Sequence, residues 1–109
     1  MSFAQKRAAA SLSIRRAARQ EAERQARALF GELQLALESS IPCHCTLLGS
    51  DLTEKMEIEL SIELRFEDYR EMMDAEGTAG DFLEENCQAL IGWKRSASNG
   101  YGFKAILLF

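Results

Sequence analysis

The stretch MEIELSIELRF, residues 56–66, constrains the fold of this chain more than any other segment. Apolar side chains occupy every second position, and glutamates, a serine and an arginine stand between them. Because successive side chains of a strand point to opposite faces, this alternation predicts a strand with one buried and one solvated face. Such one-sided burial is typical of antiparallel sheets. We therefore expect a sheet covered on one side, with Glu57, Glu59 and Glu63 forming an acidic outer face.

The first forty residues predict one long helix. From Ser2, a suitable N-cap, to Ser39 most residues are good helix formers, and Pro42 ends the run. A helix of about 37 residues would be about 55 Å long, more than a small domain covers. We therefore expect residues 1–20 to form an overhanging helical arm. One face carries the apolar stripe expected to contact the core, namely Ala22, Ala26, Leu29, Phe30, Leu33 and Leu37.

Charge is distributed unevenly along the chain. Residues 1–31 hold seven lysines and arginines against two glutamates and so carry +5, which leaves −9 for the remainder of a chain of net charge −4. Such a layout offers complementary surfaces to a second copy or to two different partners. The predicted interaction residues of the basic helix are Arg15, Arg16, Arg19, Arg24 and Arg27.

The same helix carries a second, weaker pattern. Positions spaced alternately by four and three residues from Phe3 form a coiled-coil-like seam that is interrupted by charges. The alternative is a solvated helix with ion pairs between Glu23 and the arginines four residues on either side, Arg19 and Arg27. The apolar members of the seam, which we predict to mediate self-association, are Phe3, Ala10, Ile14 and Ala17.

Four further elements follow Pro42. CHCTLL at 43–48 predicts a short strand, and FKAILLF at 103–109 predicts an apolar strand suited to a central or well-covered position. EDYREMMDAE at 67–76 predicts a short helix that Gly77 closes, and DFLEENCQALIGW at 81–93 predicts another helix.

The predicted fold class is α+β, in one domain of residues 1–109. A long N-terminal helix and two shorter helices pack on a small, mostly antiparallel sheet of about three strands, in the order αββααβ.

This order resembles that of the type II KH domain, with the motif GTAG between the two shorter helices. The resemblance implies a turn, Gly77, Thr78, Ala79 and Gly80, whose backbone approaches nucleic-acid phosphates. Phosphate affinity comes mainly from cations, whereas acidic residues flank this motif. Nucleic-acid binding by this turn and the N-terminal arginines is therefore the alternative function.

The sequence predicts no enzyme, metal or cofactor. His44 is the sole histidine, and nothing marks a serine or cysteine as its activated partner. In a strand Cys43 and Cys45 point away from His44, so the three do not converge on one tetrahedral ion. With Cys87 the cysteine count is odd, and no secretion signal is evident, so we expect reduced thiols.

No apolar run is long enough to span a bilayer, so we expect a cytoplasmic protein without membrane contact. The favoured function is a non-catalytic protein-interaction module: a self-associating bacterial or bacteriophage accessory or inhibitor protein. It would form a homodimer and bind a further macromolecule, a protein in the first place, through the basic helix and the acidic sheet and helix surface.

Overall fold

The structure, a computed structural model, describes residues 3–96 and 101–109, and for residues 3–17 the backbone alone. These residues form two helices and four strands. In chain order they are α1 (Phe3–Ser40), β1 (His44–Leu52), β2 (Ile58–Arg65), α2 (Tyr69–Asn86), β3 (Ala89–Arg95) and β4 (Gly102–Leu108).

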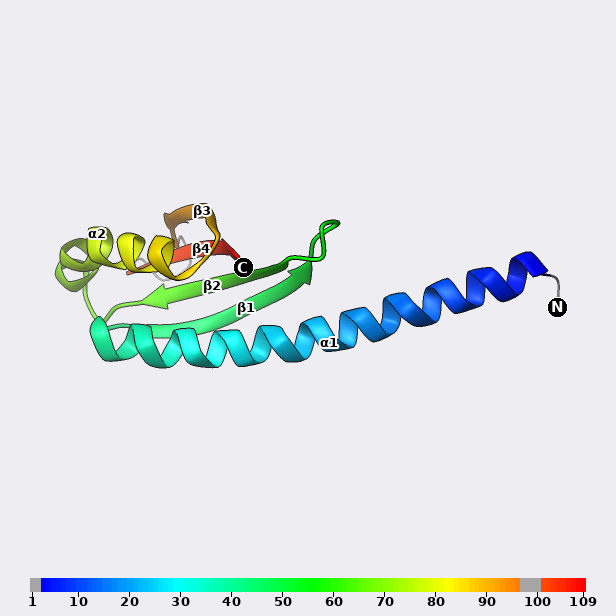
Figure 1. The fold of residues 1–109 in the computed structure, drawn as a ribbon. Helices are drawn as coiled ribbons and strands as arrows, with labels where there is room; N and C mark the ends of the chain where they lie inside the picture. The colour runs from blue at the N-terminus through cyan, green and yellow to red at the C-terminus, as the bar shows by residue number, and fades with distance from the viewer. Residues whose placement is uncertain (1–2, 97–100) are drawn as a thin grey trace.

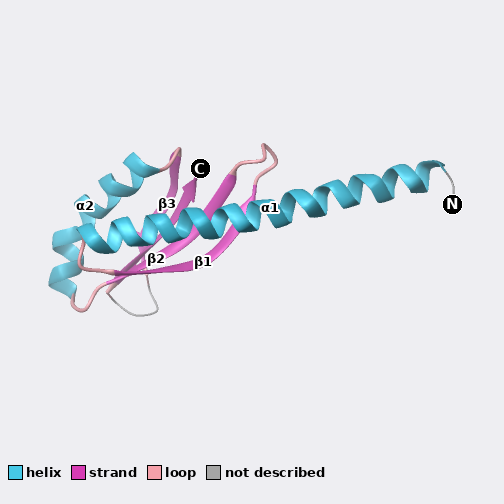
Figure 2. Cartoon of the chain, turned by 60° about the horizontal axis from the view of Figure 1, so that its bottom comes forward, coloured by secondary structure: helices cyan, strands magenta, loops and turns pink. Residues whose placement is uncertain are grey.

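The four strands form one antiparallel sheet in the order β1-β2-β4-β3. The predicted alternation is confirmed, since the apolar side chains of β2 from Ile58 to Leu64, and Phe66 after it, are buried. Buried residues of both helices join these side chains in one core. Both helices therefore cover the same face of the sheet, and Figure 2 shows α1 crossing in front of β1 and β2.

The α+β class and the antiparallel sheet are confirmed, but the element order is αββαββ. The prediction of a helix over 81–93 is wrong beyond Asn86, where Cys87 takes an extended conformation. Residues 89–95 pair with β4 as the fourth strand, which places Trp93 beside Phe103 in the core. Strand pairing thus overrides the helical spacing of the apolar residues.

The predicted break at Gly77 is also wrong, because α2 runs through it without interruption. Two glycines in a helix cost about 1 kcal/mol each. Burial of Met72 and Leu83 on one face contributes more than this, at roughly 2 kcal/mol for each side chain. Asp68 caps the start of the helix by accepting a hydrogen bond from the amide of Glu71 at 2.8 Å.

Helix α1 is much longer than the sheet it covers, and its N-terminal part runs well past the strands (Figure 1). Of its apolar stripe, Ala26, Leu33 and Leu37 are buried, and Leu29 and Phe30 pack against the core. The radius of gyration is 17.6 Å, compared with about 13 Å for a compact chain of this length. The long axis of 64 Å is set by this helix.

The outer edge of β1 is covered by side chains of α1. The Cys45 amide donates to Glu38 Oε1 at 3.0 Å, and the Cys45 carbonyl accepts from Gln34 Nε2 at 2.9 Å. These contacts satisfy backbone groups that an edge strand otherwise leaves open to pairing.

Candidate functional site

The face of the sheet turned away from α1 and α2, here called the open face, carries a hollow lined by exposed apolar side chains. Its middle is hollowed over about 630 Å³, and the lining includes Leu48, Ser61, Ile91, Gly92 and Ile106. Leu48 and Ile91 are 51% and 55% exposed, although both are large apolar side chains. The open face therefore has an apolar middle.

Irregular pairing in both edge strands produces this arrangement. In β1 the register shifts between Leu47 and Gly49, and in β3 between Leu90 and Gly92. Leu48 and Ile91 are the extra residues at these two bulges. A bulge re-aims a side chain, and here both bulges place an apolar residue around the open-face hollow.

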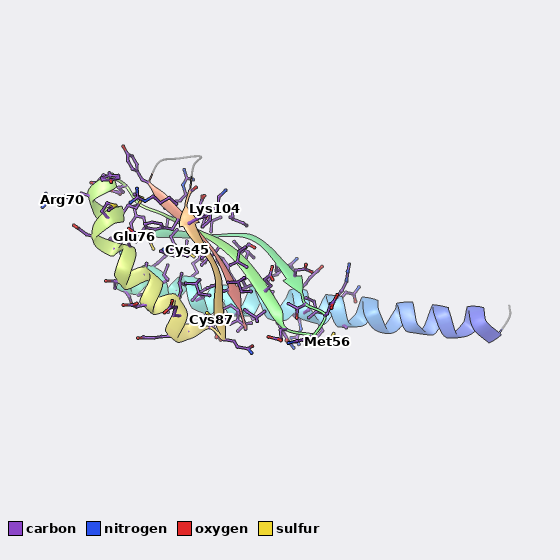
Figure 3. The ribbon with its side chains drawn as sticks, turned by 90° about the horizontal axis from the view of Figure 1, so that it is seen from above. Cys45, Met56, Arg70, Glu76, Cys87 and Lys104 are labelled. Carbon is purple, nitrogen blue, oxygen red and sulfur yellow. The ribbon has the colours of Figure 1, made fainter. Side chains whose placement is uncertain are left out.

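Charged residues stand at the two ends of the open face. Lys94 and Lys104 lie opposite each other at one end, and we call them the basic corner. Asp51 and Glu59 lie opposite each other at the other end, and we call them the acidic corner. In Figure 3, Lys104 lies near one end of the sheet and Met56, in the turn between β1 and β2, near the other.

The predicted acidic face is therefore not uniformly acidic or uniformly exposed. Glu63 is 7% exposed; its carboxylate accepts a hydrogen bond from Ser96 Oγ at 2.7 Å and lies 3.9 Å from Arg65 Nε. Glu59 is half-buried within the acidic corner, and Glu57 is half-buried in the turn before β2. The alternation predicts the side on which these glutamates lie, but not their burial, which depends on neighbouring strands.

On the basic helix α1, Arg19, Arg24 and Arg27 are exposed. Arg24 Nε lies 3.1 Å from Glu21 Oε2, and this contact lowers the pKa of Glu21 and raises that of Arg24. The ion pairs expected between Glu23 and its flanking arginines are absent from the described residues. Arg19 and Arg27 thus present unpaired charges within that part of the chain.

Several predicted residues of α1 lie where only the backbone is described. They belong to one continuous helix, and their side chains lie outside the described part of the chain. The interaction residues in this part are Arg15 and Arg16, and the self-association residues are Phe3, Ala10, Ile14 and Ala17.

An apolar hollow lies beside the basic helix. It measures about 600 Å³ and is lined by Ala22 and Leu29 of α1 and by Leu52, Met56 and Phe109 from the sheet side. Met56 is 63% exposed and has a φ of 63°, in the left-handed region. A residue other than glycine is uncommon in that region. Glu21 and Gln25 also line the α1 side of this hollow, and no described arginine does.

The motif GTAG lies inside α2 and forms no turn. Ala79 is fully buried against the core, whereas Gly77 and Thr78 are exposed and Gly80 is half-buried. A side chain at Gly77 or Gly80 would meet nothing within 4 Å. The turn that the KH resemblance implies is therefore absent at these residues.

The thiol of Cys43 is held in its weakly nucleophilic, protonated form. Cys43 and His44 line a hollow of about 490 Å³ with Arg65, Glu67 and Glu71. Burial, and then the charge of Glu38, raises the pKa of the Cys43 thiol to about 11. The thiol stays protonated at neutral pH, so it is a poor nucleophile. Among the described residues no group of three or more His, Cys, Asp or Glu side chains is placed to hold a metal ion.

The buried thiol of Cys45 makes the stability of the fold decrease as the pH becomes alkaline. Burial, followed by the charges of Cys43 and Glu38, raises its pKa to about 12, whereas in the unfolded chain the pKa is about 8.5. Above pH 9 the unfolded state therefore binds fewer protons, and we expect the free energy of unfolding to fall by about 1 kcal/mol per pH unit. Urea unfolding between pH 7 and about pH 10.5 measures this slope. Cys45→Ala should reduce the slope and leave the part that the raised pKa of Cys43 contributes. An unchanged slope in that variant would contradict the assignment.

Among known proteins, no family model, no curated protein and no solved structure matches this chain. In the described part of the chain, no helix is long and apolar enough to cross a membrane.

Proposed function

We propose that this chain is a non-catalytic protein-interaction module. It associates with itself, and it binds a protein partner through helix α1. The observation that carries the proposal is a long helix that runs past its own sheet and exposes Arg19 and Arg27, which form no ion pair with the described residues. Such a helix offers its surface to another molecule, since a helix gains most of its stability from packing.

The partner surface that suits α1 is acidic at its rim and apolar at its centre. The arginines attract carboxylates, and the hollow between α1 and the sheet, lined by Leu52, Met56 and Phe109, offers apolar contact. A protein surface can supply both carboxylates and apolar side chains, which is why we propose a protein as the partner. The protonated state of Cys43 and Cys45 at neutral pH supports a function without thiol catalysis.

Nucleic-acid binding by the same arginines is the second candidate. The exposed side chains of Arg19, Arg24 and Arg27 favour it. Glu21 and Glu23 on the same helix, and the −9 carried by residues 32–109, oppose it because they repel phosphates.

The experiment that tests the proposal compares two charge-matched double variants of the full chain. Arg19→Glu/Arg27→Glu alters α1, and Lys55→Glu/Arg70→Glu makes the same charge change at exposed positions elsewhere. Each tagged protein captures partners from host lysate after nuclease treatment, with quantification by mass spectrometry. We expect proteins held by wild type and by the control to fall at least about tenfold with the α1 variant.

Equal capture by both variants would contradict the role of α1. Wild-type capture that requires intact RNA or DNA and falls steeply with salt would favour the nucleic-acid function instead.

A further inference from the structure

Two cross-strand pairs of like charge stand on the open face. Lys94 lies opposite Lys104 in the basic corner, and Asp51 lies opposite Glu59 in the acidic corner. Like charges directly opposite each other in an antiparallel sheet are destabilising. None of the four residues forms an ion pair within the described part of the chain. Each corner also has one opposite charge nearby, since Lys104 lies opposite Glu63 of β2 and Arg19 of α1 lines a small hollow together with Asp51. The isolated chain thus carries two pairs of like charge, of opposite sign, which these neighbours offset without forming an ion pair within the described residues.

The two corners cannot neutralise each other within one chain. The basic corner lies on β3 and β4 at one edge, in the row of Glu63, and the acidic corner lies on β1 and β2 at the other edge. Glu59 and Glu63 are four residues apart on β2, roughly 13 Å along the strand. The corners are therefore diagonally opposite on a rigid sheet.

The surface between the corners is apolar where an open sheet face is usually polar. Ile106 and Leu108 of β4 alternate with the buried Phe103, Ala105 and Leu107 and so point to the open face. A strand that is apolar on both sides is typical of a sheet covered on both faces. The helices cover one face only.

We propose that a second copy of this chain packs face to face on the open face and covers Leu48, Ile91 and Ile106. A two-fold rotation brings the basic corner of each copy over the acidic corner of the other. Both like-charge pairs are then neutralised at once, and one self-complementary patch serves both copies, as a two-fold interface requires. The inference rests on the proposed self-association and assigns it to the sheet instead of the arm.

The size of the face indicates a reversible dimer. Four strands about 4.8 Å apart, the shortest of them seven residues long, give a shared face of roughly 20 Å by 24 Å. Two such faces bury roughly 1,000 Å², at the lower end for specific interfaces. We therefore expect a dissociation constant on the order of 100 µM.

The experiment uses two charge-reversed double variants of the full chain. Lys94→Glu/Lys104→Glu makes both corners acidic, and Asp51→Lys/Glu59→Lys makes both corners basic. In sedimentation velocity we expect wild type to dimerise, and each variant alone to dimerise at least about tenfold more weakly. An equimolar mixture should recover the dimer, because each acidic corner then meets a basic one.

A matched pair of single variants tests the apolar middle. Leu48→Lys places a charge in the interface, whereas Leu35→Lys makes the same change on α1, where Leu35 is 72% exposed. We expect Leu48→Lys to weaken the dimer at least about tenfold, and Leu35→Lys to leave it within about twofold of wild type.

Three results would overturn the inference. Wild type that stays monomeric up to about 500 µM would remove both the sheet dimer and the proposed self-association. If wild type dimerises but the equimolar mixture of the two charge-reversed variants stays monomeric, the pairing of basic with acidic corners is contradicted. A dimer that Ile14→Glu abolishes and Leu48→Lys leaves intact would keep the proposed self-association and assign it to the arm.

Discussion

Replacing Phe103 by alanine is expected to lower the free energy of unfolding by about 4 kcal/mol. Phe103 of β4 is completely buried, stacks on Trp93 with ring centroids 4.8 Å apart, and meets Phe66 edge to face at 5.9 Å. The variant loses the burial of a large ring and leaves a cavity between strands that the two helices cover. Urea unfolding followed by circular dichroism measures the loss.

The matched control for this prediction is Leu35→Ala on α1. Leu35 is 72% exposed, so its removal should change the free energy of unfolding by less than about 0.5 kcal/mol. A loss below about 2 kcal/mol for Phe103→Ala would contradict the packing described for the core.

Two glycine-to-alanine substitutions should change stability in opposite directions. A Cβ at Gly102 would lie 2.7 Å from the carbonyl oxygen of Leu64 on the neighbouring strand and 3.5 Å from Ser96 Cβ. Because the closer atom belongs to the backbone, the strands must separate, and we expect Gly102→Ala to destabilise the protein by about 2–3 kcal/mol. The shift should also disturb the hydrogen bond between Ser96 and Glu63.

Gly77→Ala is the matched counterpart within α2. Gly77 is exposed, helical and has nothing within 4 Å of the added Cβ. We expect a gain of about 0.5–1 kcal/mol from the higher helix propensity of alanine. Thermal unfolding of both variants provides the comparison. A loss of stability in Gly77→Ala would indicate that GTAG needs glycine, as a turn would.

The sequence identifies the elements whose patterns are set locally. The alternation over 56–66 places β2 and its buried face, and the stripe from Ala26 to Leu37 places the packed half of α1. The helix predicted over 81–93 is wrong from residue 87 onward, because helical spacing of apolar residues is compatible with a strand when β4 is available for pairing. The prediction of a helix break at Gly77 is wrong because the buried, core-facing residues of α2, from Met72 to Leu83, lie on both sides of the glycines.

The open-face hollow and its two charged corners were not visible in the sequence. They depend on which strands become neighbours and on bulges at Leu48 and Ile91, which follow from long-range pairing. One signal is present, since the apolar run of 103–109 predicts a strand in a central or well-covered position. In the described structure β4 is central, and the helices cover one of its two faces.

Backbone NMR of the full chain as a function of concentration tests the central claim most directly, because it reports on every amide at once. Between about 30 µM and about 1 mM, a range that brackets the expected dissociation constant, we predict concentration-dependent shifts at Ser61, Gly92, Lys104 and Ile106. Amides of Leu33 and Leu37, on the covered side of the sheet, should stay constant. Spectra without concentration dependence, or shifts confined to α1, would contradict self-association through the open face.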